Sequence, residues 1–181
     1  MKKAQVTVWI ALLICAGAWG QDEFSAIKCG TDIPRALIGK RFANGRVVVT
    51  EAAHRSIGLE DLGGTEISEK LFLISWRICG AEYQLLENTR SRMILDVLAF
   101  PTHSRNSPEA IGGCQIDGKE SPDAIVAVLD NSGGFDVMHS SRLLSAISAW
   151  KIDETHERFQ QLTASRVTCP AQTVVTLDGG P

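Results

Sequence analysis

Hydrophobic and polar residues alternate along much of the middle of the chain. In residues 71–78 (LFLISWRI), four hydrophobic side chains share one face, while Ser75 and Arg77 share the other. Successive side chains of an extended strand point to opposite faces, so this pattern predicts a half-buried β-strand. By the same reasoning we expect strands at residues 47–50, 83–86, 92–100, 124–129, 144–152, 158–162 and 166–169. Residues 124–129 (AIVAVL) are hydrophobic on both faces, which favours a central strand.

A helical pattern precedes these strands. Thr31 or Asp32 can cap a helix that begins near Ile33, and Pro34 is tolerated in a first helical turn. Asn44-Gly45 would end that helix in a left-handed conformation. Its hydrophobic stripe would consist of Ile33, Leu37, Ile38 and Phe42. Residues 51–62 are ambiguous, and one interpretation is a helical turn that ends at Gly63-Gly64.

The fold class predicted from these elements is mainly β, either all-β or α+β. We expect a single antiparallel sheet or a small barrel with one or two short helices. The regular alternation of strands with helices of 10–15 residues, typical of a doubly wound fold, is absent from the pattern. Residues 21–181 are expected to form one globular domain, with residues 171–181 as a loose tail.

Residues 1–20 have the three-part layout of a secretory signal peptide. Lys2 and Lys3 form the charged start, residues 6–16 the apolar run, and Ala18-Trp19-Gly20 a cleavage site ahead of Gln21. The apolar run is shorter than the roughly 20 residues that a membrane-spanning helix needs. The sequence therefore predicts a protein that is secreted or periplasmic, with no membrane span after cleavage.

Removal of the signal peptide changes the charge and the cysteine count. The 181-residue chain carries a net charge of −3, whereas residues 21–181 carry 16 Lys and Arg against 21 Asp and Glu, a net charge of −5. An acidic domain argues against a nucleic-acid partner, which requires a concentrated basic face. Four cysteines are left, an even number that predicts two disulfides in an oxidising compartment. Cys29–Cys79 and Cys114–Cys169 is the preferred pairing among three possible ones.

Two polar loops are the places where a functional site is most expected. Residues 101–113 contain His103-Ser104, and residues 131–142 contain His139-Ser140. A nucleophilic serine needs a histidine within hydrogen-bond reach and a third group that orients it. His103, Ser104 and His139 are therefore the candidate catalytic residues, although polar loop residues that stabilise turns are the simpler interpretation.

Metal and cofactor sites are not indicated. Glu51 and His54 have the Glu-x-x-His spacing of one metal-ligand pair, but a di-iron bundle needs two such pairs on long helices. Residues 130–136 lack the ligand pattern of a calcium loop and favour an Asx-rich turn. The gaps between the cysteines match neither a compact zinc finger nor a redox motif. No cofactor is expected.

The sequence leaves two classes of function open. The first is a non-catalytic exported domain that binds a protein, an envelope component or a small molecule through its long loops. The second is a small extracytoplasmic hydrolase that uses histidine, serine or aspartate residues of those loops. The small size and the lack of a specific catalytic motif favour the first class.

Overall fold

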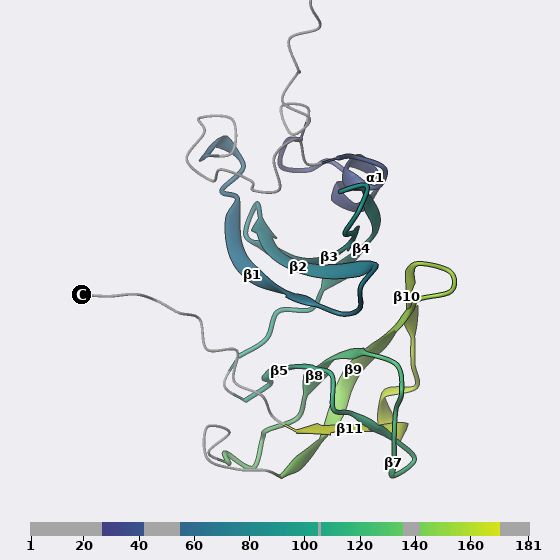
Figure 1. Cartoon of the computed structure of the whole chain (residues 1–181). Helices are drawn as coiled ribbons and strands as arrows, with labels where there is room; N and C mark the ends of the chain where they lie inside the picture. The colour runs from purple at the N-terminus through teal and green to yellow at the C-terminus, as the bar shows by residue number, and fades with distance from the viewer. Residues whose placement is uncertain (1–26, 42–54, 105, 136–141, 171–181) are drawn as a thin grey trace, which may run out of the picture.

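A computed structural model describes residues 27–41, 55–104, 106–135 and 142–170. These residues form antiparallel β-sheets with one short α-helix, so the mainly β prediction is confirmed. The described strands divide into two sheets that face each other (Figure 1). None of the helices in the described ranges has the length and apolar composition needed to cross a bilayer.

The first sheet is a four-stranded antiparallel meander in the order β1-β2-β3-β4. Its central hairpin is tight, because Cys79 (φ 53°) and Gly80 (φ 78°) alone separate the paired residues Ile78 and Ala81. Positive φ at both central residues matches the right-handed twist of the flanking strands. The strands are β1 (Glu60–Glu66), β2 (Leu71–Ile78), β3 (Ala81–Asn88) and β4 (Ile94–Phe100).

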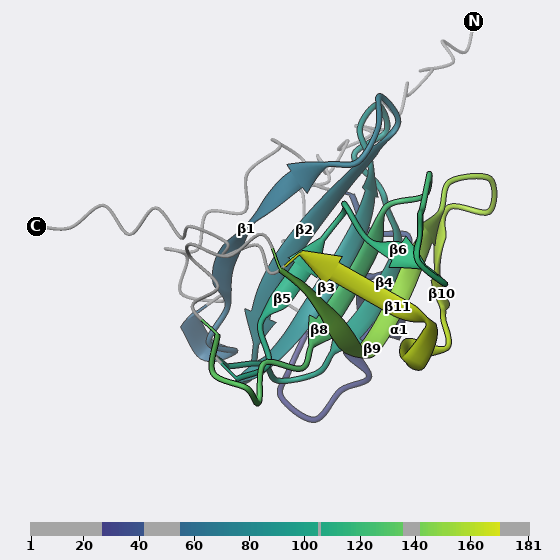
Figure 2. The same cartoon turned by 90° about the horizontal axis from the view of Figure 1, so that it is seen from below.

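The second sheet has seven strands, in the order β5-β8-β9-β11-β6-β7, with β10 paired to β9. The long strand β9 organises this sheet, because its first residues pair with β11 and its later residues with β8 and β10 (Figure 2). The strands are β5 (Glu109–Ile111), β6 (Gln115–Ile116), β7 (Lys119–Glu120), β8 (Ile125–Leu129), β9 (Leu143–Asp153), β10 (Arg158–Gln161) and β11 (Val167–Pro170).

The expected helix is present but short. Helix α1 (Ile33–Leu37) begins where the sequence predicts, with the Asp32 carboxylate accepting a hydrogen bond from the Arg35 backbone N–H at 3.2 Å. It ends at Leu37, and Ile38, expected on the buried stripe, is among the exposed large hydrophobic residues. Phe42, Asn44-Gly45 and the strand expected at 47–50 lie outside the described residues.

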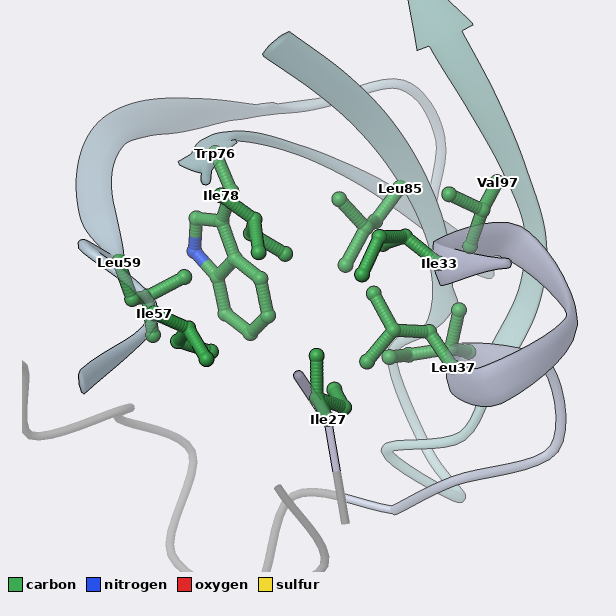
Figure 3. Packing of buried hydrophobic residues seen from close by; sticks show 10 residues of the cluster. Ile27, Ile33, Leu37, Ile57, Leu59, Trp76, Ile78, Leu85 and Val97 are labelled. Atoms are coloured by element: carbon green, nitrogen blue, oxygen red, sulfur yellow. The ribbon is translucent and has the colours of Figure 1, made fainter. Parts of the chain in front are cut away.

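The two faces of the first sheet are both covered. One face packs against α1 and the N-terminal segment around Trp76, as Figure 3 shows. The opposite face packs against the second sheet, with Leu73 and Leu86 of the first sheet in one cluster with Val126, Val128 and Ile152. Burial on both faces makes β2 and β3 the central strands of the molecule.

The second sheet also encloses hydrophobic residues on the face that points away from the first sheet. Strand β8 is buried over its whole length, as predicted for residues 124–129. Val126 and Val128 pack in the cluster between the two sheets, whereas the alternate residues of β8 pack in a cluster on the outer face of the second sheet. Cys114 and Cys169, which are both buried, belong to this outer cluster. The cluster also contains Ala110, Ile125, Ala127, Leu129, Leu144, Ala146, Ala149 and Val167.

A helical turn is present at residues 55–58, within the ambiguous segment 51–62, but it does not end at Gly63-Gly64, because this glycine pair lies inside β1. Gly63 has a φ of +109° and lies at a register shift in the pairing with β2. Gly64 is packed so closely that an added Cβ would lie 2.6 Å from the Leu73 carbonyl oxygen. One glycine supplies a backbone conformation that L-residues avoid, and the other permits close approach of the strands.

Both disulfides have the predicted pairing, Cys29–Cys79 and Cys114–Cys169. The first attaches the segment before α1 to the β2–β3 turn. The second attaches β11, the last described strand, to the residue before β6. Each bond closes a loop of at least 50 residues.

Replacing Cys114 and Cys169 together by alanine should lower the free energy of unfolding by about 4 kcal/mol, because the cross-link restricts a long loop of the unfolded chain. Urea unfolding followed by tryptophan fluorescence measures this change. The Cys29–Cys79 bond closes a loop of similar length, so the Cys29→Ala/Cys79→Ala variant should lose a similar amount. A loss below about 1 kcal/mol in both variants would contradict the loop-closure explanation.

Candidate functional site

Four polar side chains lie on the face of the first sheet that packs against the second sheet. Ser75 and Arg77 occupy alternate positions of β2, and Glu82 and Gln84 occupy the paired positions of β3. This face is therefore hydrophobic at one end, where Leu71, Leu73 and Leu86 lie, and polar at the other. Polar groups inside a sandwich need partners, because an unpaired buried polar group is costly.

The second sheet and the loop before it provide those partners. Gln84, which is only 2% exposed, donates a hydrogen bond from Nε2 to Oε1 of Glu109 on β5 at 2.8 Å. Ser75 donates from its hydroxyl to Gln84 Oε1 at 2.7 Å. A chain of hydrogen bonds thus runs from β2 through β3 to the second sheet.

His103 lies between two carboxylates. Its Nδ1 is 2.9 Å from Glu82 Oε2, and its Nε2 is 3.9 Å from Glu109 Oε2. The imidazole lies in the loop after β4 and makes a T-shaped contact with the Phe100 ring at a centroid distance of 5.7 Å. Phe100 in turn contacts Trp150 of β9 at 5.9 Å, so the aromatic rings also bridge the two sheets.

Arg77 connects this cluster to the surface. Its guanidinium donates to Glu82 Oε1 at 2.7 Å and to Glu60 Oε2 of β1 at 2.5 Å. Exposure of the side chains falls steadily along the chain of contacts, from 57% at Glu60 through 37% at Arg77 to 12% at Glu82. We call Ser75, Arg77, Glu82, Gln84, His103 and Glu109 the inter-sheet cluster.

The inter-sheet cluster contains a carboxyl group with a shifted pKa. Burial of Glu109 raises its pKa to about 7, and the negative charge of Glu82 contributes in the same direction. Both causes act by penalising the charged form of the carboxyl group. The protein therefore holds, between its sheets, a group that exchanges a proton near neutral pH.

Such a group can serve as a general acid or base if a substrate reaches it. The side chain of Glu109 is only 9% exposed, and His103 is 25% exposed. The partners of His103 in the described chain are carboxylates and an aromatic ring. The cluster can thus store and release protons, but its serine, Ser75, donates its hydroxyl hydrogen to Gln84 rather than to the imidazole of His103.

The predicted candidates have different locations. His103 belongs to the inter-sheet cluster, whereas the Ser104 hydroxyl lies 3.2 Å from that of Ser107 in a tight turn. His139 lies outside the described residues, as do Glu51 and His54. The described parts of the two long loops do meet, because the Asn131 N–H donates to the Asn106 carbonyl at 2.8 Å.

The loop that begins at Asp130 is an Asx turn, in agreement with the sequence. The Asp130 carboxylate accepts from the Ser132 N–H at 2.8 Å. The Asn131 side chain donates a hydrogen bond to the Phe135 carbonyl and accepts one from the Phe135 N–H, both at 3.0 Å. The described residues contain no group of three or more side chains that could hold a metal ion.

A second feature is a surface hollow of about 670 Å³ between the two sheets. Its walls come from the β1–β2 turn and from the β9–β10 turn, which project from opposite sheets (Figure 1). The Asp153 carboxylate shapes the second turn by accepting from the Thr155 and His156 N–H groups at 3.1 Å. The hollow is lined by Ser68, Glu69, Lys70, Leu71, Glu154, Thr155 and Glu157.

Sequence reasoning missed Glu82, Gln84 and Glu109. A signal for the first two was present, since a two-residue turn after Ile78 places them opposite Arg77 and Ser75. Glu109 carried no such signal, because its position between the sheets depends on how β5 pairs with β8. The alternation in residues 71–78 predicts a half-buried strand, whereas the face that carries Ser75 and Arg77 packs against the second sheet as well.

Comparison with known proteins adds no assignment. No family model, curated protein or solved structure matches the chain.

Glu82→Gln should lower the pKa of Glu109 by a few tenths to about one unit, because it removes a negative charge that disfavours ionisation of Glu109. The carboxyl carbon shift of Glu109, followed by NMR against pH, measures the effect. Glu120→Gln removes an exposed carboxylate on β7 and should leave the titration of Glu109 unchanged. A Glu109 midpoint near 4.5 in the unmodified protein would contradict the assigned environment.

Proposed function

We propose that the chain is an exported β-sandwich domain that acts by binding a partner rather than by catalysis. The two disulfides are compatible with an oxidising compartment, and residues 1–20 have the layout of a signal peptide. Export would deliver residues 21–181 to the periplasm or the cell exterior.

The observation that carries the binding proposal is the hollow between the β1–β2 and β9–β10 turns. Concave sites at the boundary between packed units are common places for ligands. Both walls are set by fixed structure, because one turn leads into buried Leu71 and the other is held by Asp153. A partner seated there would contact both sheets at once.

The charges of the hollow point to a cationic partner. Three carboxylates, those of Glu69, Glu154 and Glu157, line it together with one ammonium group, that of Lys70. A net negative concave surface attracts positive charge, and the net charge of −5 over residues 21–181 adds to that attraction. We therefore propose a lysine- or arginine-bearing peptide segment of a protein partner as the ligand.

The hydrolase alternative has less support. It relied on His103, Ser104 and His139 forming a nucleophilic site. The Ser104 hydroxyl instead takes part in the turn with Ser107 and Asn106, and Nδ1 of His103 faces Glu82. The acid–base capacity of Glu109 is the feature that would favour catalysis, and its side chain is largely buried.

Expression of the full chain in an export-competent bacterial host tests the export proposal. N-terminal sequencing of the protein outside the cytoplasm should begin at Gln21, and the intact mass without reductant should show no free thiol. Replacement of Leu12 and Leu13 by arginine, which interrupts the apolar run, should retain the protein in the cytoplasm. Recovery of an uncleaved chain in the cytoplasmic fraction of the unmodified protein would contradict export.

Titration of the exported protein with a decapeptide of alternating lysine and glycine tests the proposed ligand class. Amide shifts should change around Glu69 and Glu154, and Glu154→Gln should weaken binding about two- to fivefold, as expected for one exposed ion pair. Binding should also weaken with salt.

Two controls make this titration specific. Glu120→Gln removes an equally exposed carboxylate outside the hollow and should leave the affinity unchanged. A decapeptide of alternating glutamate and glycine should not bind. Equal loss in Glu120→Gln and Glu154→Gln, or no shift at millimolar lysine peptide, would contradict the proposal.

A further inference from the structure

The two edges of the first sheet differ in how they are covered. The sheet ends at β4 on one side and at β1 on the other (Figure 1). The β4 edge is occupied, because the Gly39 N–H donates to the Ile94 carbonyl at 2.8 Å and the Ile94 N–H to the Lys40 carbonyl at 2.9 Å. Farther along β4, the Asp96 carboxylate accepts from the Phe159 N–H at 2.8 Å. In the described parts of the chain, β1 pairs only with β2, and its other edge is open.

The register of the strands shows which backbone groups of β1 point to the open edge. Residues of an antiparallel strand alternate between those that bond to a given neighbour and those whose N–H and C=O groups point away from it. The Ile67 N–H donates to the Leu71 carbonyl at 3.0 Å, so Ile67 is directed towards β2. By alternation Thr65 is also directed towards β2, whereas Gly64 and Glu66 are directed away from it. Both outward residues are exposed, so the edge offers two donors and two acceptors.

This edge is short but accessible. The register shift between Asp61 and Gly63 interrupts the ladder, which leaves residues 63–66 as the regular stretch. Gly64 has no side chain that would hinder the approach of another backbone. An exposed edge of this kind is a template for strand addition, in which main-chain hydrogen bonds hold an extended segment.

The charges of β1 determine which segment fits. The strand carries Glu60, Asp61 and Glu66 and no basic residue. Glu60 pairs with Arg77 inside the sheet, whereas Asp61 and Glu66 form no ion pair with any described residue. A second copy of this chain would bring the same carboxylates to the edge, with a net charge of −5 on each domain, and like charges across paired strands are destabilising.

We propose that the open edge of β1 is a second binding site, separate from the hollow, to which an extended lysine- or arginine-bearing segment of another protein adds as an antiparallel strand. Its backbone bonds to Gly64 and Glu66, and its basic side chains lie beside Asp61 and Glu66. The antiparallel direction continues the pairing of the whole first sheet. The segment shares its charge with the ligand proposed for the hollow, but neither site requires the other.

Amide exchange with water, measured by NMR on the disulfide-bonded exported protein, tests strand addition. The probe is a hexapeptide of alternating lysine and threonine, because threonine favours strands. At a peptide concentration about ten times the dissociation constant, exchange of the Gly64 and Glu66 amides should slow about tenfold, because only the free fraction exchanges. The Thr65 amide, which is directed towards β2, is the internal control and should change much less. Absence of slowing at Gly64 and Glu66 would overturn the proposal.

A modified peptide separates backbone pairing from attraction between charges. The same hexapeptide, N-methylated at its four central residues, keeps its positive charges but loses the donors that pair with the edge. It should bind to β1 about tenfold more weakly. Equal binding of the two peptides would show attraction between charges alone and would overturn strand addition.

Two variants of Glu66 make the same separation in the protein. Glu66→Gln removes the charge and keeps the outward N–H, and should weaken binding about two- to fivefold. Glu66→Pro also removes that N–H without breaking a bond to β2, and should weaken binding a further two- to tenfold. Equal affinities of the two folded variants would contradict the proposal. If Glu66→Pro fails to fold, the methylated peptide decides the same question on the unmodified protein.

Failure of this site is distinguishable from failure of the hollow. Glu154→Gln should leave the slowing at Gly64 and Glu66 unchanged, since Glu154 lines only the hollow. Shifts confined to Glu154 and Thr155, with no slowing on β1, would overturn the edge site and leave the hollow intact. Slowing on β1 that grows with protein concentration in the absence of peptide would show pairing between two copies, and would overturn the choice of a basic segment.

Discussion

The burial of β2 and β3 on both faces is the constraint on which the rest of the structure depends. One face of this hairpin must be covered by α1 and the N-terminal segment, and the other by the second sheet. Because the hairpin also carries Ser75, Arg77, Glu82 and Gln84 on its inner face, the second sheet has to bring polar partners as well as hydrophobic ones. The cluster around Glu109 is the result.

Local structure could be predicted where the sequence carries a local signal. The alternation in residues 71–78, the capping position Asp32 and the apolar run of β8 each identify an element from neighbouring residues alone. The division of the strands into two sheets has no such signal, since it depends on long-range pairing. The pair Gly63-Gly64 was misread because its role is set by the neighbouring β2, through a register shift and a close approach to Leu73.

The candidate site was predictable only in part, for a related reason. His103 could be selected because histidines are few and this one follows a strand in a polar loop. Glutamates are abundant and mostly solvated, so nothing in the sequence separates Glu109 from the others. Its properties arise from the pairing of β5 with β8, which turns the side chain inward towards Gln84. Burial, a tertiary property, determines its chemistry.

The placement of the disulfides also determines how the molecule would respond to a pulling force on its two ends. Tension would pass through the Cys29–Cys79 and Cys114–Cys169 bonds and would bypass the residues that each bond encloses. The load would fall on the 35 peptide units between Cys79 and Cys114, which can extend to at most about 120 Å. That stretch contains β3, β4 and β5, so mechanical stress would be concentrated on the segment that carries Glu82, His103 and Glu109.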